Sequence, residues 1–131
     1  EFVPKFKIAK ISFPIYRKME DILEASETSL DDICYFNFLP YRGKDNAYPQ
    51  TKSAMSKIIP NCIDKFVQPA LQTLQPSLVV TFGKQVDTYI KDYWKNFPYE
   101  TVSWNRARAL TPEVRIEREN SVEQLRKWAN R

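Results

Sequence analysis

Asn37 is the first residue whose type and position suggest a specific chemistry. The aromatic run YFNF occupies residues 35–38, and the loop after it carries Arg42 and Lys44. An Asn side chain offers two donors and one acceptor, so it can read the Watson–Crick edge of a base. Aromatic rings nearby could stack on that base, and the basic side chains could hold phosphates. Alternatively, Asn37 caps the end of a strand and bonds only to backbone groups.

Polar residues also follow two other stretches that the sequence predicts to be strands. Gly83 and Lys84 come after SLVVTF at 77–82, and SWNRAR at 103–108 contains the end of a shorter strand. If these strands are parallel, their carboxyl ends share one edge of the sheet, where α/β proteins bind ligands. A helix that begins behind Gly83 adds a favourable field for an anion. The residues expected to contact nucleic acid are Arg42, Lys44, Lys84, Ser103, Asn105, Arg106 and Arg108.

Several kinds of chemistry have no support in the sequence. The chain has no His, which removes the commonest general base and the commonest zinc ligand. No Ser or Cys has a visible base partner for nucleophilic hydrolysis. Gly43-Lys44 and Gly83-Lys84 lack the second Gly and the hydroxyl residue of a phosphate-binding loop. We therefore expect neither a metal nor a cofactor.

Charge and cysteine usage indicate an intracellular protein, cytoplasmic or nuclear, with a weak preference for anionic partners. The 131 residues include 20 Lys and Arg against 16 Asp and Glu, for a net charge of +4. Cys34 and Cys62 show no pairing motif and are expected to be buried, reduced thiols. No apolar run approaches the roughly 18 residues of a membrane span, so no membrane contact is expected. Basic residues cluster late in the chain at Arg106, Arg108, Arg115 and Arg118.

Periodicity and the placement of Pro and Gly predict strands that alternate with helices. The expected strands are residues 6–11, 33–38, 77–82 and 100–104. The expected helices are residues 14–25, 53–75 with a bend or restart at Pro60 and a kink or break at Pro69, 84–96, and a last helix that begins at a capping pattern at Ser121. The runs 33–38 and 77–82 are apolar without clear alternation, which indicates strands covered on both faces. Residues 113–120 are expected to be a solvated surface segment.

Strands that alternate with helices favour parallel pairing in a helix-flanked sheet. We therefore expect an α/β fold, a three-layer sandwich with a short parallel sheet of three or four strands in which 77–82 is central. Tyr89, Tyr93 and Trp94 lie on one side of the following helix and are expected to belong to the core. Residues 1–131 are taken as a single domain, which could be a fragment of a longer protein because the chain begins Glu-Phe without Met.

The order of several short motifs matches that of a known family. YFN at 35–37 and PYR at 40–42 are followed by Cys62 in CIDKFVQPALQTL and by PSLVVTFGKQV at 76–86. From about Phe13 to Ile90 the chain resembles the middle of the uracil-DNA glycosylase superfamily, particularly its shorter thermophile-type and mismatch-type branches. In that family a strand ends in Asn before a basic loop, and a Pro-led strand later ends in a Gly turn. The resemblance implies a uracil-DNA glycosylase-like fold and a role in DNA base recognition and repair.

The resemblance also implies roles for particular residues. Asn37 corresponds to the amide that reads the base, and Phe13 lies where an aromatic ring stacks on the extruded base. SWNRAR at 103–108 falls where the family has a late loop that enters the DNA minor groove. A flipped base needs an edge reader, a stacking ring and a side chain that fills the gap. These three segments could supply them.

The departures from the family concern its catalytic groups. The family's first motif is Gly-rich and positions the group that orients the attacking water, whereas KIAKISFPIY at 7–16 has no Gly and no carboxylate. Either that motif lies before residue 1 in a longer protein or this chain has lost it. The family's late loop commonly carries a His, which SWNRAR lacks. Asp31 and Asp32 precede their expected strand, at the wrong end for catalysis, and Tyr41 stands where an iron–sulfur branch has a Cys.

Three functions are compatible with this resemblance and with the departures from it, and the sequence excludes none of them. Nucleic-acid binding on a uracil-DNA glycosylase-like fold, without complete catalytic machinery, is ranked first. An active base-excising glycosylase, whose first motif lies upstream or has been replaced, is the second. A protein-interaction module on the same fold is the third, ahead of an unrelated α/β domain. The expected partner is DNA, single- or double-stranded, with a protein partner as the alternative.

Overall fold

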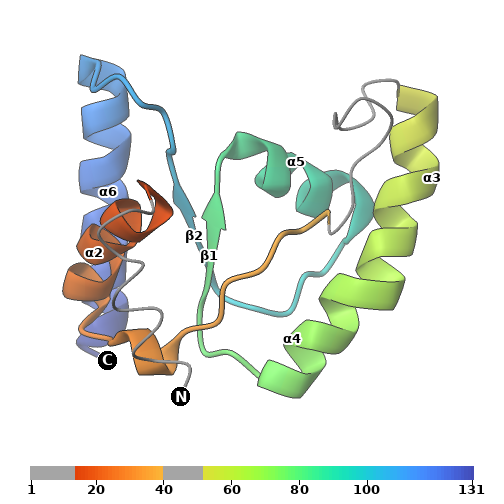
Figure 1. The fold of residues 1–131 in the computed structure, drawn as a ribbon, viewed down its shortest axis with the longest axis horizontal. Coiled ribbons are helices and arrows are strands. Elements are labelled where there is room, and N and C mark those ends of the chain that lie inside the picture. The colour runs from red at the N-terminus through yellow and green to blue at the C-terminus, as the bar shows by residue number, and fades with distance from the viewer. Residues whose placement is uncertain (1–13, 40–51) are drawn as a thin grey trace. The chain divides into compact units, whose positions relative to one another are not determined.

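A computed structural model describes residues 14–39 and 52–131 of the chain (Figure 1). Within these ranges, side chains are described from Met19 and from Ser53 onward. The strand expected over 6–11 lies outside the described residues.

The contacts within the chain divide it into two compact units. Residues 35–103 form one unit, and residues 1–34 together with 104–131 form the other. The described residues are mostly helical, and they contain one sheet of two strands.

A parallel strand–helix–strand motif forms the centre of the unit 35–103. β1 (Val79–Phe82) leads into α5 (Lys84–Tyr93), and β2 (Thr101–Trp104) then pairs with β1 (Figure 1). Gly83 joins β1 to α5 with a φ of 89°, a conformation that a residue with a Cβ adopts only with strain. The carboxyl end of β1 therefore lies next to the amino terminus of α5.

A long helical segment precedes this motif. α3 (Lys52–Cys62) continues into the π-helical turn η3 (Ile63–Val67) and then into α4 (Gln68–Leu74). Pro69 has no N–H, and its ring would clash with the carbonyl group four residues earlier in a regular helix. The wider turn at η3 accommodates the proline without ending the helix. The bend predicted at this proline is thus a π-turn, and the helix ends before Pro76 as predicted.

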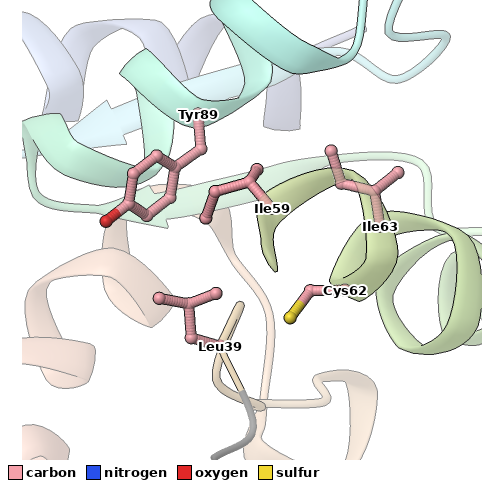
Figure 2. Packing of buried hydrophobic residues seen from close by; sticks show 5 residues of the cluster. All are labelled: Leu39, Ile59, Cys62, Ile63 and Tyr89. Carbon is pink, nitrogen blue, oxygen red and sulfur yellow. The ribbon is translucent and has the colours of Figure 1, made fainter. Parts of the chain in front are cut away.

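The core of the unit 35–103 contains side chains from α3, η3, α5 and the chain before residue 40 (Figure 2). The buried members are Leu39, Ile59, Cys62, Ile63 and Tyr89. Phe38 packs on Tyr89 with the ring centroids 5.7 Å apart. Tyr93 and Trp94 pack against the same cluster. The prediction that the aromatic face of α5 belongs to the core is confirmed.

In the described part of the other unit, the α-helices α2 (Pro14–Ser26) and α6 (Pro112–Ala129) pack together, and a short 3-10 helix, η1, spans Leu30–Asp32. α2 buries Met19, Ile22 and Ala25, whose spacing of three residues places them on one face. On α6, the Leu125 side chain is fully buried. The helix predicted over 14–25 is therefore confirmed.

α6 begins nine residues earlier than the sequence analysis expected. Thr111 caps it, because its hydroxyl oxygen accepts the Val114 N–H at 3.3 Å, and Pro112 occupies the first turn. Ser121, the predicted start, lies buried inside the helix and donates its hydroxyl to the Glu117 carbonyl oxygen at 3.1 Å. Residues 113–120 are helical, and each of them is exposed or half-buried. The prediction that this run is a solvated surface segment is therefore confirmed, although its helical structure was not expected.

Residues 33–37 do not form the strand that the sequence analysis expected. Tyr35 is 49% exposed and Phe36 is 40% exposed, so this run is not covered on both faces. Among the described residues, β1 pairs only with β2, and Val79 and Val80 of β1 are half-buried rather than buried on both faces. The central position of 77–82 in a larger sheet stays a prediction. The fold is thus mixed α/β with a two-stranded parallel sheet, and the three-layer sandwich stays a prediction.

Within the described residues, Cys34 and Cys62 form no disulfide, and only Cys62 is buried. Cys62 belongs to the core, whereas Cys34 is exposed because it lies in the extended stretch before residue 38. The expectation of two buried thiols is wrong for Cys34. In the part of the chain that the structure describes, no helix combines the length and the apolar character that crossing a membrane requires.

Candidate nucleic-acid interface

Asp87 connects the carboxyl ends of the two parallel strands. It lies in the first turn of α5, and its carboxylate oxygens accept hydrogen bonds from Thr81 Oγ1 at 2.6 Å and from Ser103 Oγ at 2.7 Å. The two hydroxyl oxygens are themselves 3.4 Å apart. Thr81 is buried, whereas Ser103 is exposed. These bonds attach α5 to both strands at the edge where α/β sheets bind ligands.

Ser103 is predicted from the sequence to lie at this edge of the sheet, whereas Asp87 is not. A signal was present, because Thr81 in VVTF and Ser103 in TVSW are each the third residue of a four-residue strand. Side chains alternate along a strand, so hydroxyls at matching positions of parallel neighbours face the same side. A carboxylate in the first turn of the intervening helix lies within their reach. Within the described ranges, no group of three or more His, Cys, Asp or Glu side chains could hold a metal ion.

Asn105 fastens the chain after β2 to helix α6. Its Nδ2 donates to Glu117 Oε2 at 2.6 Å, and its Oδ1 accepts the Ala107 N–H at 2.9 Å. The second bond closes a turn of the type that Asn side chains favour. The side-chain amide of Asn105 therefore holds the local backbone, with one N–H and the carbonyl oxygen engaged in these two bonds.

Arg118 of α6 holds the same stretch from a second direction. Its Nε donates to the Asn105 carbonyl oxygen at 2.9 Å, and its Nη2 donates to the Ala107 carbonyl oxygen. Its guanidinium carbon also lies 6.0 Å from the centroid of the Trp104 ring, within the range of a cation–π contact. The planar, forked guanidinium makes this double contact with the backbone possible.

We call residues 105–108 the arginine segment. Its side chains alternate in exposure: Asn105 and Ala107 are half-buried, whereas Arg106 and Arg108 are exposed. The hydrogen bonds of Asn105 and Arg118 fix the backbone around Arg106. Two permanently charged guanidinium groups are thus displayed on a backbone held by α6.

Asn37 is exposed in the irregular stretch 33–37 and belongs to the unit 35–103. It makes no hydrogen bond to another residue that the structure describes. Two residues earlier, Tyr35 meets Phe82 at the end of β1, edge to face with the ring centroids 5.9 Å apart. The alternative in which Asn37 caps a buried strand end loses its premise, because residues 33–37 form no strand.

The predicted contact residues belong to different units of the chain, and some of them lie outside the described residues. Asn37, Lys84 and Ser103 belong to the unit 35–103. Asn105, Arg106 and Arg108 belong to the other unit. Phe13, Arg42 and Lys44 lie outside the described residues. A single cleft that unites all these positions therefore stays a prediction.

Comparison with known proteins returns no match. No protein-family model, no curated protein and no solved structure matches this chain. The function is therefore inferred from the chemistry of the residues and their arrangement.

Proposed function

We propose that this chain is a nucleic-acid-binding domain that lacks complete machinery for base excision. The observation that carries this proposal is the arginine segment, where Arg106 and Arg108 are exposed on a backbone that α6 holds in place. Phosphate contacts supply much of the affinity of such proteins, and guanidinium groups bind phosphate oxygens in pairs. A backbone that is already fixed loses less conformational entropy when the ligand binds.

A uracil-DNA glycosylase-like arrangement is the finer part of the proposal. The support for it is the order of elements, in which a Pro-led strand ends at Gly83 and a helix follows. In this proposal exposed Asn37 reads a base edge and Phe13 stacks on the base. Further phosphate contacts would come from the remaining predicted positions, Arg42, Lys44, Lys84 and Ser103.

An active glycosylase is the second candidate, and Asp87 is the observation that favours it. This carboxylate lies at the strand ends, where a water-orienting group would be needed, although the family's first motif is not visible in the sequence. Both of its oxygens accept hydrogen bonds from hydroxyl groups, and the chain has no His to stabilise a leaving base. We therefore rank catalysis below binding.

A protein-interaction module is the third candidate. Tyr35 and Phe36 are 49% and 40% exposed, and aromatic side chains are enriched in protein interfaces. The same exposed rings could also stack on unpaired bases, so they do not by themselves favour a protein partner.

A salt-titrated binding measurement tests the proposal. The full chain would be mixed with fluorescent single-stranded and double-stranded DNA, and the dissociation constant would be measured over a range of salt concentrations. We expect binding at low salt that weakens linearly on a log–log plot as counterions compete for the phosphates. If neither DNA form binds at low salt, the proposal fails and the protein-interaction function takes first place.

A further inference from the structure

We infer that Glu117 and Arg118 are positioning residues that set the geometry of the arginine segment, and that Arg118 does not itself bind phosphate. This inference rests on the proposed nucleic-acid function. The sequence places Arg118 in one basic cluster with Arg106 and Arg108. In the structure, Arg118 points two of its donors at the protein backbone.

The contacts of Arg118 explain why its charge is not offered to a ligand. Two of its nitrogens donate to the carbonyl oxygens of Asn105 and Ala107, and its guanidinium lies against the Trp104 ring. The side chain is half-buried, in contrast to exposed Arg106 and Arg108. A Lys at this position would keep the charge, but one ammonium group cannot reproduce the planar fork.

Glu117 gives the inference a sharp test, because its charge and its hydrogen bond predict opposite effects. Its carboxylate repels a polyanion, so electrostatics alone predicts tighter DNA binding when it is removed. The same carboxylate accepts the 2.6 Å bond from Asn105 that fastens the arginine segment to α6. If the hydrogen bond to Asn105 matters more than the repulsion of DNA, the removal of Glu117 weakens DNA binding.

Glu119 is the matched control. It lies two residues further along α6, carries the same charge and is exposed. Replacement by Ala suits a helix interior at both positions. The substitutions Glu117→Ala and Glu119→Ala therefore change the net charge equally, and only the first removes a bond to the arginine segment.

The first experiment measures DNA binding of the full chain and its variants at several salt concentrations. Glu119→Ala should bind as tightly as the unaltered chain or up to about threefold tighter, whereas Glu117→Ala should bind about three- to tenfold more weakly, the effect of one lost hydrogen bond. Arg118→Lys should lower the magnitude of the salt slope by up to about two at unchanged net charge, because two phosphate contacts lose their geometry. Equal tightening in both Glu variants, or an unchanged slope in Arg118→Lys, would overturn the inference.

The second experiment does not depend on nucleic acid. Trypsin cleaves after Arg106 and Arg108, and a held backbone resists cleavage because the protease needs a local opening. Cleavage at these two bonds should be about three- to tenfold faster in Glu117→Ala and unchanged in Glu119→Ala. Equal rates in the two variants would overturn the positioning role. Faster cleavage combined with no DNA binding by the unaltered chain would overturn the proposed function and support the positioning of the segment.

Discussion

The Ser103 hydroxyl donates a 2.7 Å hydrogen bond to the carboxylate of Asp87, which lies 16 residues earlier in the sequence. The bond joins the end of β2 to the start of α5. Thr81 makes the equivalent bond from β1 to the other oxygen of the same carboxylate. One acidic side chain thus holds the three elements of the strand–helix–strand motif together.

Replacement of Asp87 should destabilise the unit 35–103. Asp87→Ala leaves the Thr81 hydroxyl buried without its acceptor and removes two bonds to a charged group, so a loss of about 1.5 to 3 kcal/mol is expected. Urea denaturation would measure it. Asp92→Ala removes an exposed carboxylate of the same helix and should change the free energy of unfolding by less than about 0.5 kcal/mol. Equal effects of the two substitutions would show that Asp87 does not hold the motif together.

Asn37→Ala should change base preference rather than stability. The side chain is exposed, so its removal should alter the free energy of unfolding by less than about 0.5 kcal/mol. If the amide reads a base edge, discrimination among unpaired bases should fall by about 1 to 3 kcal/mol at an unchanged salt slope. Thermal melts beside binding curves for oligonucleotides that differ in one unpaired base would separate the effects. A large loss of stability with an unchanged base preference would show that Asn37 has a structural role and does not read a base.

Removal of either exposed arginine of the arginine segment should weaken DNA binding for every sequence. Arg106→Ala and Arg108→Ala should each lower the magnitude of the log–log salt slope by about one, if each removes one phosphate contact. The same result is expected for Arg42→Ala, which lies outside the described residues. Arg126→Ala, on an exposed position near the end of α6, is the control and should leave the slope unchanged. If the salt slope fell equally in Arg126→Ala, DNA binding would depend on the overall positive charge of the chain and not on the arginine segment.

The chain should show little or no excision of uracil. General acid–base help and electrostatic stabilisation are each worth at least about 100-fold in rate, and the sequence supplies no His for either task. Incubation with a uracil-containing single strand, followed by alkaline cleavage of abasic sites, would reveal any activity. Robust turnover that is lost in Asp87→Asn would instead favour the active glycosylase and a catalytic role for that carboxylate.

Gln75→Gly should stabilise the protein by about 0.5 to 1 kcal/mol. Gln75 ends α4 in the left-handed conformation, with a φ of 45°, and its N–H donates to the Leu71 carbonyl oxygen at 2.8 Å. Glycine adopts this conformation without a Cβ clash. The same change inside the helix, Gln72→Gly, should cost about 1 kcal/mol, and thermal or urea unfolding compares the two. Destabilisation by both would show that helix α4 does not end at this position.

Elements whose signals act within a few residues can be predicted from the amino-acid sequence. Pro14 and the apolar spacing after it predicted α2, and the run before Gly83 predicted β1 with α5 behind it. The cap of α6 was equally readable, since Thr111, Pro112 and Glu113 form a common helix start. The charged run after this cap hides the helix, because it shows no clear apolar periodicity. These signals are readable because capping, proline geometry and helical periodicity depend on nearby residues alone.

The pairing of segments and the contacts between distant side chains depend on how the whole chain packs. An apolar run such as 33–38 becomes a strand only if a sheet edge is available to its backbone, and its own residues do not encode that edge. The bonds from Asp87 to Thr81 and Ser103, and from Asn105 to Glu117, join residues separated by 6 to 16 positions in the sequence. Hydrogen bonds form only at short distances and favourable angles, so the packing of helices and strands selects these partners from many residues of the same type.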